Sequence, residues 1–193
     1  MTQRPLLALA AALALSGCFS FGGKPPPTLM RLTADRELAA GTTRTSNTAQ
    51  AITVVVPVVP QELQTPRVPV RTGATAVSYV KNAQWIDTPD ALFARLLGET
   101  ISARTGRVVL DPKQFTFDPG TRLTGTLHSF GFNADTSEAV VIYDAVLGRG
   151  AEAVEARRFE ARVPVAVIDA TTAPVALNNA ANSVAAEVAA WIG

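Results

Sequence analysis

Three runs of alternating apolar and polar residues constrain the fold of this chain more than any other feature. They cover residues 122–132, 138–147 and 154–165, and short loops rich in turn-forming residues separate them. Alternation with a period of two is typical of strands that bury one face and expose the other. The pattern therefore predicts a three-strand antiparallel meander with one wet face.

Two amphipathic helices are predicted on either side of this meander. Residues 88–105 carry an apolar stripe at three- and four-residue spacing, with Thr88 as the predicted cap and Pro89 at the first helical position. Residues 174–192 carry a second stripe, with Asn182 on the opposite, polar side. This order of elements predicts an α+β domain in which the two helices cover one face of a mostly antiparallel sheet.

The segment before the first helix is predicted to add shorter strands. The β-branched run at residues 52–56 is apolar on both faces, which makes it the best candidate for the centre of the sheet. Residues 62–71 lie among prolines and are expected to be extended or turn-rich, with Val68 and Val70 at edge-type positions. Residues 76–81 are expected to form another short strand. In the meander, Gly125 and Gly131 are expected to mark bulges.

The N-terminus is typical of an export signal. Residues 6–15 contain only leucine and alanine, and Arg4 precedes them. A membrane-spanning helix needs about 20 apolar residues, so this run has the length of a signal peptide and not of a permanent anchor. Residues 1–17 are therefore interpreted as a signal peptide.

The export signal ends at Leu15, Ser16, Gly17 and Cys18, a sequence that resembles a bacterial lipobox. In a lipobox the cysteine receives a diacylglyceryl group and the peptide is cut just before it, so Cys18 is the predicted site of lipid attachment. This cysteine is the single one in the chain, so acylation leaves no thiol for a disulfide, a metal or a nucleophile. The alternatives are an ordinary signal peptide with a chance cysteine, or a cytosolic helix with a buried thiol.

The mature chain is predicted to consist of a tether and one domain. Residues 18–27 contain glycines and three consecutive prolines that disfavour a helix, and residues 28–193 form a single periplasmic domain. Removal of residues 1–17 leaves 16 basic and 16 acidic residues, a balance that does not suggest nucleic acid as a partner. Phe19, and not aspartate, follows the cysteine, so lipoprotein sorting by analogy favours the inner leaflet of the outer membrane, facing the periplasm.

The sequence offers few groups for catalysis. His128 is the single histidine and lies on the polar face of its strand, while Ser129 is expected to point to the opposite face. Asp87, Asp90 and Glu99 are better explained by the preference of helix starts for acids than by a carboxylate cluster. Neither metal-ligand spacing nor a phosphate-binding glycine loop is recognisable, so no cofactor or metal site is predicted, and the chain is predicted not to be an enzyme.

The third run of the meander carries the candidate partner-binding residues Arg158, Glu160 and Arg162. The simplest interpretation of these charged residues is a solvated strand face with cross-strand ion pairs. The alternative is a polar surface on which a partner docks. Trp85 and Trp191 are expected to pack in the core. A hydrophobic groove between the helices and the sheet, able to take an acyl chain, remains open as a further alternative.

Several segments together resemble the ABC-type transport auxiliary lipoprotein family, which includes the outer-membrane partner of the paraquat-inducible MCE-domain system. They are the lipobox at Cys18, the short strand near Leu29, the block at residues 52–68, the segment 79–85 before the helix, and the closing helix at 180–192. The chain departs from the family at residues 28–30, where family members often carry tyrosines.

The resemblance implies a non-catalytic subunit of a lipid transport system. Its expected partners are an MCE-domain protein, the ABC transporter subunits and the membrane that holds the lipid anchor, and phospholipid is a further candidate ligand. The alternative is a structural or pilot-type outer-membrane lipoprotein that serves another envelope assembly. A periplasmic hydrolase is the third interpretation, and it would depend on His128.

Overall fold

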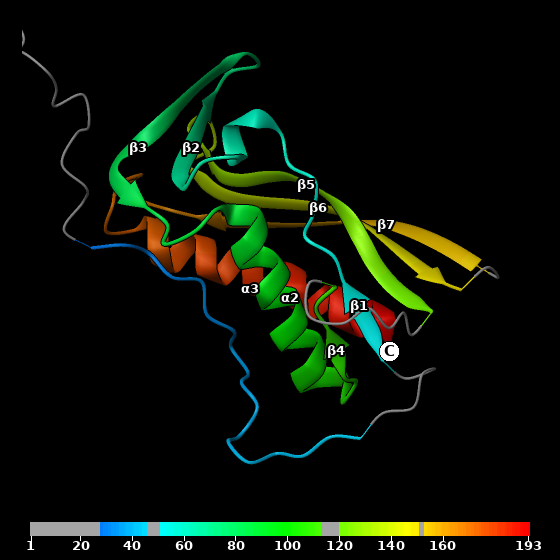
Figure 1. Ribbon diagram of the computed structural model, residues 1–193. Helices are drawn as coiled ribbons and strands as arrows, with labels where there is room; N and C mark the ends of the chain where they lie inside the picture. The colour runs from blue at the N-terminus through cyan, green and yellow to red at the C-terminus, as the bar shows by residue number, and fades with distance from the viewer. Residues whose placement is uncertain (1–27, 46–50, 113–119, 151–152) are drawn as a thin grey trace, which may run out of the picture.

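The computed structural model describes residues 28–45, 51–112, 120–150 and 153–193 (Figure 1). Its elements follow the order β1 (Ile52–Val54), the 3-10 helix η1 (Gln61–Leu63), β2 (Arg67–Thr72), β3 (Ala76–Gln84), α2 (Pro89–Thr105), β4 (Val109–Leu110), β5 (Thr121–Asn133), β6 (Glu138–Arg149), β7 (Ala153–Pro164) and α3 (Ala173–Ile192). Figure 1 shows both helices on the same side of the sheet, as the sequence predicts.

Strands β5, β6 and β7 form the predicted meander. Each neighbouring pair is antiparallel, with Leu123 opposite Leu147 and Tyr143 opposite Phe159. These four side chains are buried on the face that the helices cover. The sequence prediction of an antiparallel meander with alternating faces is therefore confirmed for this half of the sheet.

The other half of the sheet contains parallel pairings, which correct the prediction of a mostly antiparallel sheet. Strand β1 pairs in parallel with the first part of β5, β2 pairs in parallel with its last part, and β4 pairs in parallel with β1. Among the described residues, three of the six strand pairings are parallel, so the sheet is mixed. Local alternation cannot reveal such pairings, because the partners lie far apart in the sequence.

Two strand positions also differ from the prediction. Strand β1 is fully buried, but the middle of the sheet is formed by β5, which pairs with β1, β2 and β6. Strand β2 lies between β3 and β5, so Val68 is buried in the core and not at an edge. Proline is tolerated there because the register between β2 and β3 shifts between Arg67 and Pro69, where the ladder is interrupted.

The bulge in β5 lies between Leu127 and Ser129, and not at the glycines where the sequence suggested it. Gly131 allows β5 to approach β2 closely, since a Cβ atom there would lie 2.3 Å from the carbonyl oxygen of Pro69. Gly125 has the same role, because its Cβ would lie 2.2 Å from the carbonyl oxygen of Asp144. Both glycines therefore allow contact with a neighbouring strand.

Aromatic side chains join the helices to the sheet. The Phe93 ring of α2 lies edge-on to Phe130 of β5 and to Tyr143 of β6, with centroids 6.2 and 5.2 Å apart. Trp85 packs on Phe130 at 5.5 Å, and Trp191 of α3 lies 5.6 Å from Phe159 of β7. Both tryptophans therefore take the packing roles that the sequence predicts.

None of the described helices is long and apolar enough to span a bilayer.

Residues 28–45, which we call the N-terminal strap, are bound to the rest of the domain by hydrogen bonds. The Met30 amide donates to the carbonyl of Gln84 at 2.8 Å. The Asp35 amide donates to Asn182 Oδ1 at 2.9 Å, and Asn182 Nδ2 donates to the carbonyl of Thr33 at 2.8 Å. Asn182 is buried under the strap, so the polar side of α3 is covered at this point.

Candidate functional site

The outer face of the meander, which points away from the helices, carries a row of ion pairs that we call the outer-face ladder. Its first cluster centres on Asp144 of β6, which lies opposite Arg158 of β7. Arg158 Nε donates to Asp144 Oδ1 at 2.6 Å, and Arg158 Nη2 donates to Oδ2 at 2.7 Å. On the other side, His128 Nε2 of β5 lies 2.8 Å from the same Oδ2. The cluster thus links three adjacent strands.

These contacts keep the Asp144 carboxylate ionised. The hydrogen bonds from Arg158, and secondarily the contact with His128, lower the pKa of Asp144 to about 2. The same carboxylate raises the pKa of Arg158. The cluster is therefore a stable arrangement of opposite charges on a solvated surface.

The second cluster of the ladder lies at the other end of β7. Arg162 Nε donates to Glu160 Oε1 at 2.5 Å, and Arg162 Nη1 donates to Glu138 Oε2 of β6 at 3.1 Å. The pKa of Glu138 is lowered, first by the hydroxyl of Thr136 and then by Arg162. The structure thus brings the three predicted residues, Arg158, Glu160 and Arg162, onto one face and gives each an ionic partner. Their role in binding a partner remains a prediction.

The outward edge of β7 adjoins the ladder. Among the described residues, β7 pairs with β6 alone, and its first six residues are exposed on both faces. An unpaired edge offers backbone donors and acceptors to another strand, while charged side chains on both faces discourage unspecific pairing. This edge is therefore a surface on which a selected partner could add a strand.

His128 lies in the β5 bulge. The bulge changes the face on which its neighbour Ser129 lies, contrary to the prediction. The extra residue at the bulge places Ser129 opposite Ile142, on the outer face with His128, and not on the opposite face. The histidine ring is bound to Asp144 and belongs to the ladder. The signal for this bulge is a break in the alternation, because two polar residues separate Leu127 from Phe130 and the apolar positions change from odd to even numbers there.

The acidic residues near α2 serve local structure. Asp87 Oδ1 accepts the Thr88 amide at 2.7 Å, while the Thr88 side chain itself makes no capping bond, contrary to the prediction. Asp90 lies in the first turn, and Glu99 pairs with Arg95 at 3.8 Å. Within the described residues, histidine, cysteine, aspartate and glutamate form no group of three or more that could hold a metal ion.

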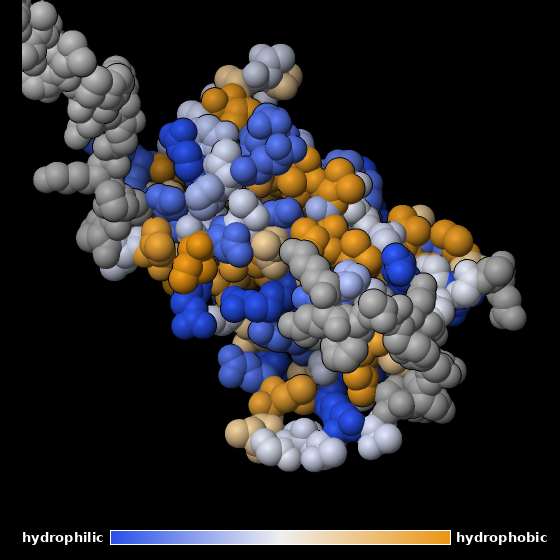
Figure 2. Space-filling view, in the orientation of Figure 1, coloured by the Kyte–Doolittle hydropathy of each residue, from blue (hydrophilic) through white to orange (hydrophobic). Residues whose placement is uncertain are grey.

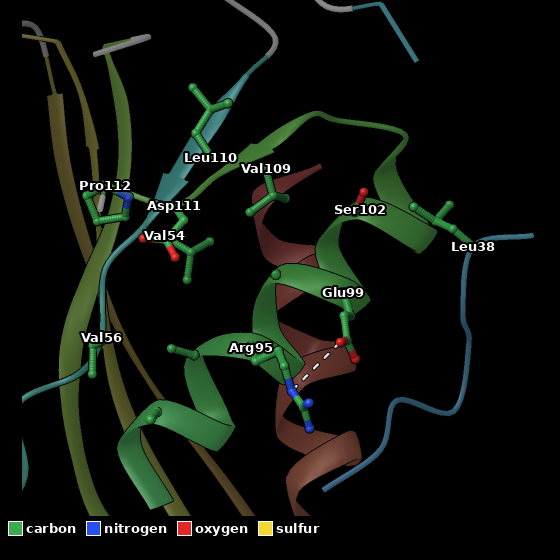
Figure 3. A pocket seen from close by; sticks show the side chains of 13 residues that line it. Leu38, Val54, Val56, Arg95, Glu99, Ser102, Val109, Leu110, Asp111 and Pro112 are labelled. Atoms are coloured by element: carbon green, nitrogen blue, oxygen red, sulfur yellow. Dashed lines mark ion pairs between the residues drawn. The ribbon is translucent and has the colours of Figure 1, made fainter. Parts of the chain in front are cut away.

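An apolar groove of about 510 Å³ lies between α2 and strands β1 and β4 (Figure 3). The small residues Ala91, Ala94 and Gly98 of α2 form one wall. The remaining lining residues are Leu38, Val54, Val56, Arg95, Glu99, Ser102, Val109, Leu110, Asp111 and Pro112. Ligand pockets commonly measure about 300–1,000 Å³ and combine apolar walls with a few polar groups. The structure thus has an open, mostly apolar groove beside α2, and its use by an acyl chain remains a prediction.

The predicted lipid-attachment residue Cys18 and the lipobox residues Leu15, Ser16 and Gly17 lie outside the described residues. The same holds for the rest of the tether up to residue 27. Acylation and cleavage at this position therefore remain sequence predictions.

Two solved structures share the fold. The crystal structure of an uncharacterized protein superimposes with a TM-score of 0.65 and 17% sequence identity, over 78% of this chain and 97% of that chain. The crystal structure of a Xanthomonas campestris protein from the DUF330 family gives a TM-score of 0.67 and 17% identity, over 86% and 94% of the two chains. No curated protein matches the sequence at a significant level.

A family model covers most of the domain. The model of the ABC-type transport auxiliary lipoprotein component matches residues 33–189, a span that contains the whole sheet, α2, most of α3 and the outer-face ladder. The match agrees with the resemblance seen in the sequence. This chain belongs to the ABC-type transport auxiliary lipoprotein component family.

Proposed function

We propose that this chain is a non-catalytic lipoprotein subunit of an ABC and MCE-type system that moves phospholipid between the inner and outer membranes. The family match over residues 33–189 carries the proposal. The lipobox supports export and attachment through Cys18, and Phe19 after the cysteine favours the inner leaflet of the outer membrane by analogy with lipoprotein sorting. The charged groups of the outer-face ladder are bound to one another, which suits a binding surface better than a catalytic site.

The attachment step has a direct test. Intact-mass analysis of the native protein should show a chain that starts at Cys18 and carries acyl groups. A Cys18→Ala variant should be lost from the membrane fraction, because the lipid provides the anchor. An unmodified N-terminal methionine with a free thiol would contradict both the attachment and the envelope location.

The expected partner is an MCE-domain protein that docks on the β7 edge and the outer-face ladder. The edge supplies unpaired backbone groups, and the ladder supplies an alternation of positive and negative side chains that a partner can match. Both features are next to each other on β7, so one partner segment can use both.

Charge reversal tests this docking site. The double variant Arg158→Glu and Arg162→Glu should recover much less MCE-domain protein than the wild type on purification from crosslinked membranes. The matched control is Arg36→Glu, an exposed arginine on the N-terminal strap that should leave recovery unchanged. Failure of the wild type to crosslink any MCE-domain protein would refute the partnership, and equal recovery by the double variant would refute the site.

The groove beside α2 favours a second role, direct carriage of phospholipid. Its volume of about 510 Å³ and its apolar walls suit one acyl chain, and Arg95 and Glu99 lie in its lining. Lipid analysis of the Cys18→Ala protein, purified without detergent, should then detect phospholipid. An Ala94→Phe variant should lose it because the new ring fills the groove, whereas Ala103→Phe on the same helix should not. Protein free of lipid would leave the chain as an adaptor.

A further inference from the structure

We propose that the end of the domain where the N-terminal strap begins is a lipid-contacting surface, which rests on the bilayer that holds the anchor. This inference depends on the proposed acylation of Cys18. It adds an orientation to the proposed function, because it states which part of the domain touches lipid and which part remains free for a protein partner.

Exposed apolar side chains gather at this end. Leu29 is 47% exposed, Ile86 55%, Val167 57% and Val175 64%. Backbone contacts bring their segments together, since the Ile86 amide donates to the carbonyl of Met30 at 2.9 Å. Figure 1 shows the start of the strap beside the start of α3, and Figure 2 shows hydrophobic surface at this end. Single exposed apolar side chains are common on any surface, and Val58 and Val154 are exposed elsewhere, but a contiguous apolar cluster marks a surface that meets a protein or a membrane.

The N-terminal strap also ties this cluster to α3. The Thr33 amide donates to Asn178 Oδ1 at 2.9 Å, and Val175 lies one helical turn before Asn178. The strap and the first turns of α3 therefore hold Leu29 and Val175 on the same end of the domain, although the two residues are far apart in the sequence.

A second apolar groove, of about 420 Å³, opens at the same end. It lies between the end of β7 and the first turns of α3. Its lining residues are Val163, Pro164, Val165, Ala166, Thr171, Thr172, Val175, Ala176 and Asn179. Val175 belongs to both the groove and the exposed cluster, so the two features form one continuous surface.

The length of the preceding chain identifies lipid as the occupant. Ten residues separate the start of Cys18 from Thr28, and a chain of this length spans at most about 36 Å. The strap therefore begins close to the bilayer. Helix α3 runs from this end toward the opposite one over 20 residues, or about 30 Å. The start of β7 at Ala153 then lies farther from the membrane than its end at Pro164.

Charge at this end does not favour an electrostatic contact. Arg31 is the exposed cation beside Leu29, whereas Asp87 follows Ile86 and Asp169 lies near the groove. With both signs present, the contact should be driven by apolar side chains that enter the headgroup boundary by about 5–10 Å. Added salt should therefore change it little.

Site-directed fluorescence quenching tests the orientation. In the mature lipoprotein the Cys18 thiol is acylated, so Val175→Cys introduces the one thiol available for an environment-sensitive dye. The matched control is Val154→Cys on β7 at the opposite end, where the valine is 72% exposed. Both proteins are incorporated into vesicles of phosphatidylethanolamine and phosphatidylglycerol that contain doxyl-labelled lipid. Val167→Cys supplies an independent position in the proposed surface.

The expected result is a blue-shifted emission and strong quenching at positions 175 and 167, with neither change at position 154. Equal quenching at all three positions, or stronger quenching at 154, would overturn the proposed orientation. Flotation of the same samples separates the two hypotheses. Proteins that float with the vesicles but show no quenching at 175 would refute this surface alone, whereas proteins that do not float would refute the anchor and the surface together.

Discussion

The two faces of the β5–β6–β7 meander consist of alternate residues of the same strands, but they hold the domain together in different ways. On the helix-covered face, Tyr143 and Phe159 lie side by side in the core. On the outer face, their neighbours Asp144 and Arg158 form an exposed ion pair. Full burial of one large apolar side chain contributes about 1.5–3 kcal/mol, whereas an exposed ion pair contributes at most about 1 kcal/mol. The covered face therefore provides most of the folding free energy, and substitutions on the outer face should cost little stability.

The largest difference between the faces should appear with Phe130→Ala. This ring contacts both Trp85 and Phe93, so its loss should lower the free energy of unfolding by about 3–5 kcal/mol. The matched control is Ile142→Ala on the outer face, where the side chain is half-buried and the loss should be much smaller. Urea unfolding of both variants measures the contrast, and equal losses would show that the outer face shares the core's role.

A smaller loss in the free energy of unfolding is expected when a methyl group is added between β5 and β2. In Gly131→Ala the new Cβ would lie 2.3 Å from the Pro69 carbonyl oxygen, so the strands must separate at a cost of about 3 kcal/mol. Gly148→Ala on β6 is the control, because its nearest atom would be 4.0 Å away. Thermal unfolding compares the two, and a stable Gly131→Ala protein would contradict the close approach.

The next effect concerns the attachment of the N-terminal strap to α3. Asn182→Ala removes the acceptor of the Asp35 amide and the donor to the Thr33 carbonyl, and should cost about 1–2 kcal/mol. The exposed Asn179 provides the control as Asn179→Ala. Hydrogen exchange should report faster exchange of the Asp35 amide in the first variant. Unchanged protection there would show that the strap is held by other contacts.

The smallest effect should come from the outer-face ladder and should depend on pH. The pKa of Asp144 falls to about 2 on folding, from about 3.9 in an unfolded chain. The carboxylate therefore stabilises the fold above about pH 4, and this stabilisation disappears as the pH falls toward 2. Solvent screening limits it to less than about 1 kcal/mol. Asp144→Asn should flatten the stability curve in this window, and an unchanged curve would mean that other carboxylates cause the acid sensitivity.

The elements that depend on local patterns were predictable from the sequence. Helix α2 begins at Pro89 and ends at Thr105, within one residue of the predicted range, because proline and the following Gly106 mark its ends. The meander was equally clear, since alternation is a local signal. The prediction also placed Arg158, Glu160 and Arg162 on one face, as the structure does.

The features that depend on distant parts of the chain were not predictable. The parallel pairing of β1 and β2 with β5 joins segments that are separated in the sequence by β3, α2 and β4, so no local pattern marks it. The bulge at His128 differs, because a local signal marks it: the apolar positions change from odd to even numbers between Leu127 and Phe130. The sequence predicted Asn182 on the polar side of α3, because nothing in that helix indicates that the N-terminal strap covers it.

The N-terminal strap has a mechanical consequence. A protein fastened at one end by lipid and gripped elsewhere by a moving assembly transmits tension between the two. With the proposed anchor at Cys18, a load would enter at Met30, which is bonded to the end of β3, and would continue through Thr33 and Asp35 into Asn182 of α3. The sheet and a helix would then share the pull within the first few residues of the N-terminal strap, so the domain could act as a stiff link between the membrane and a partner.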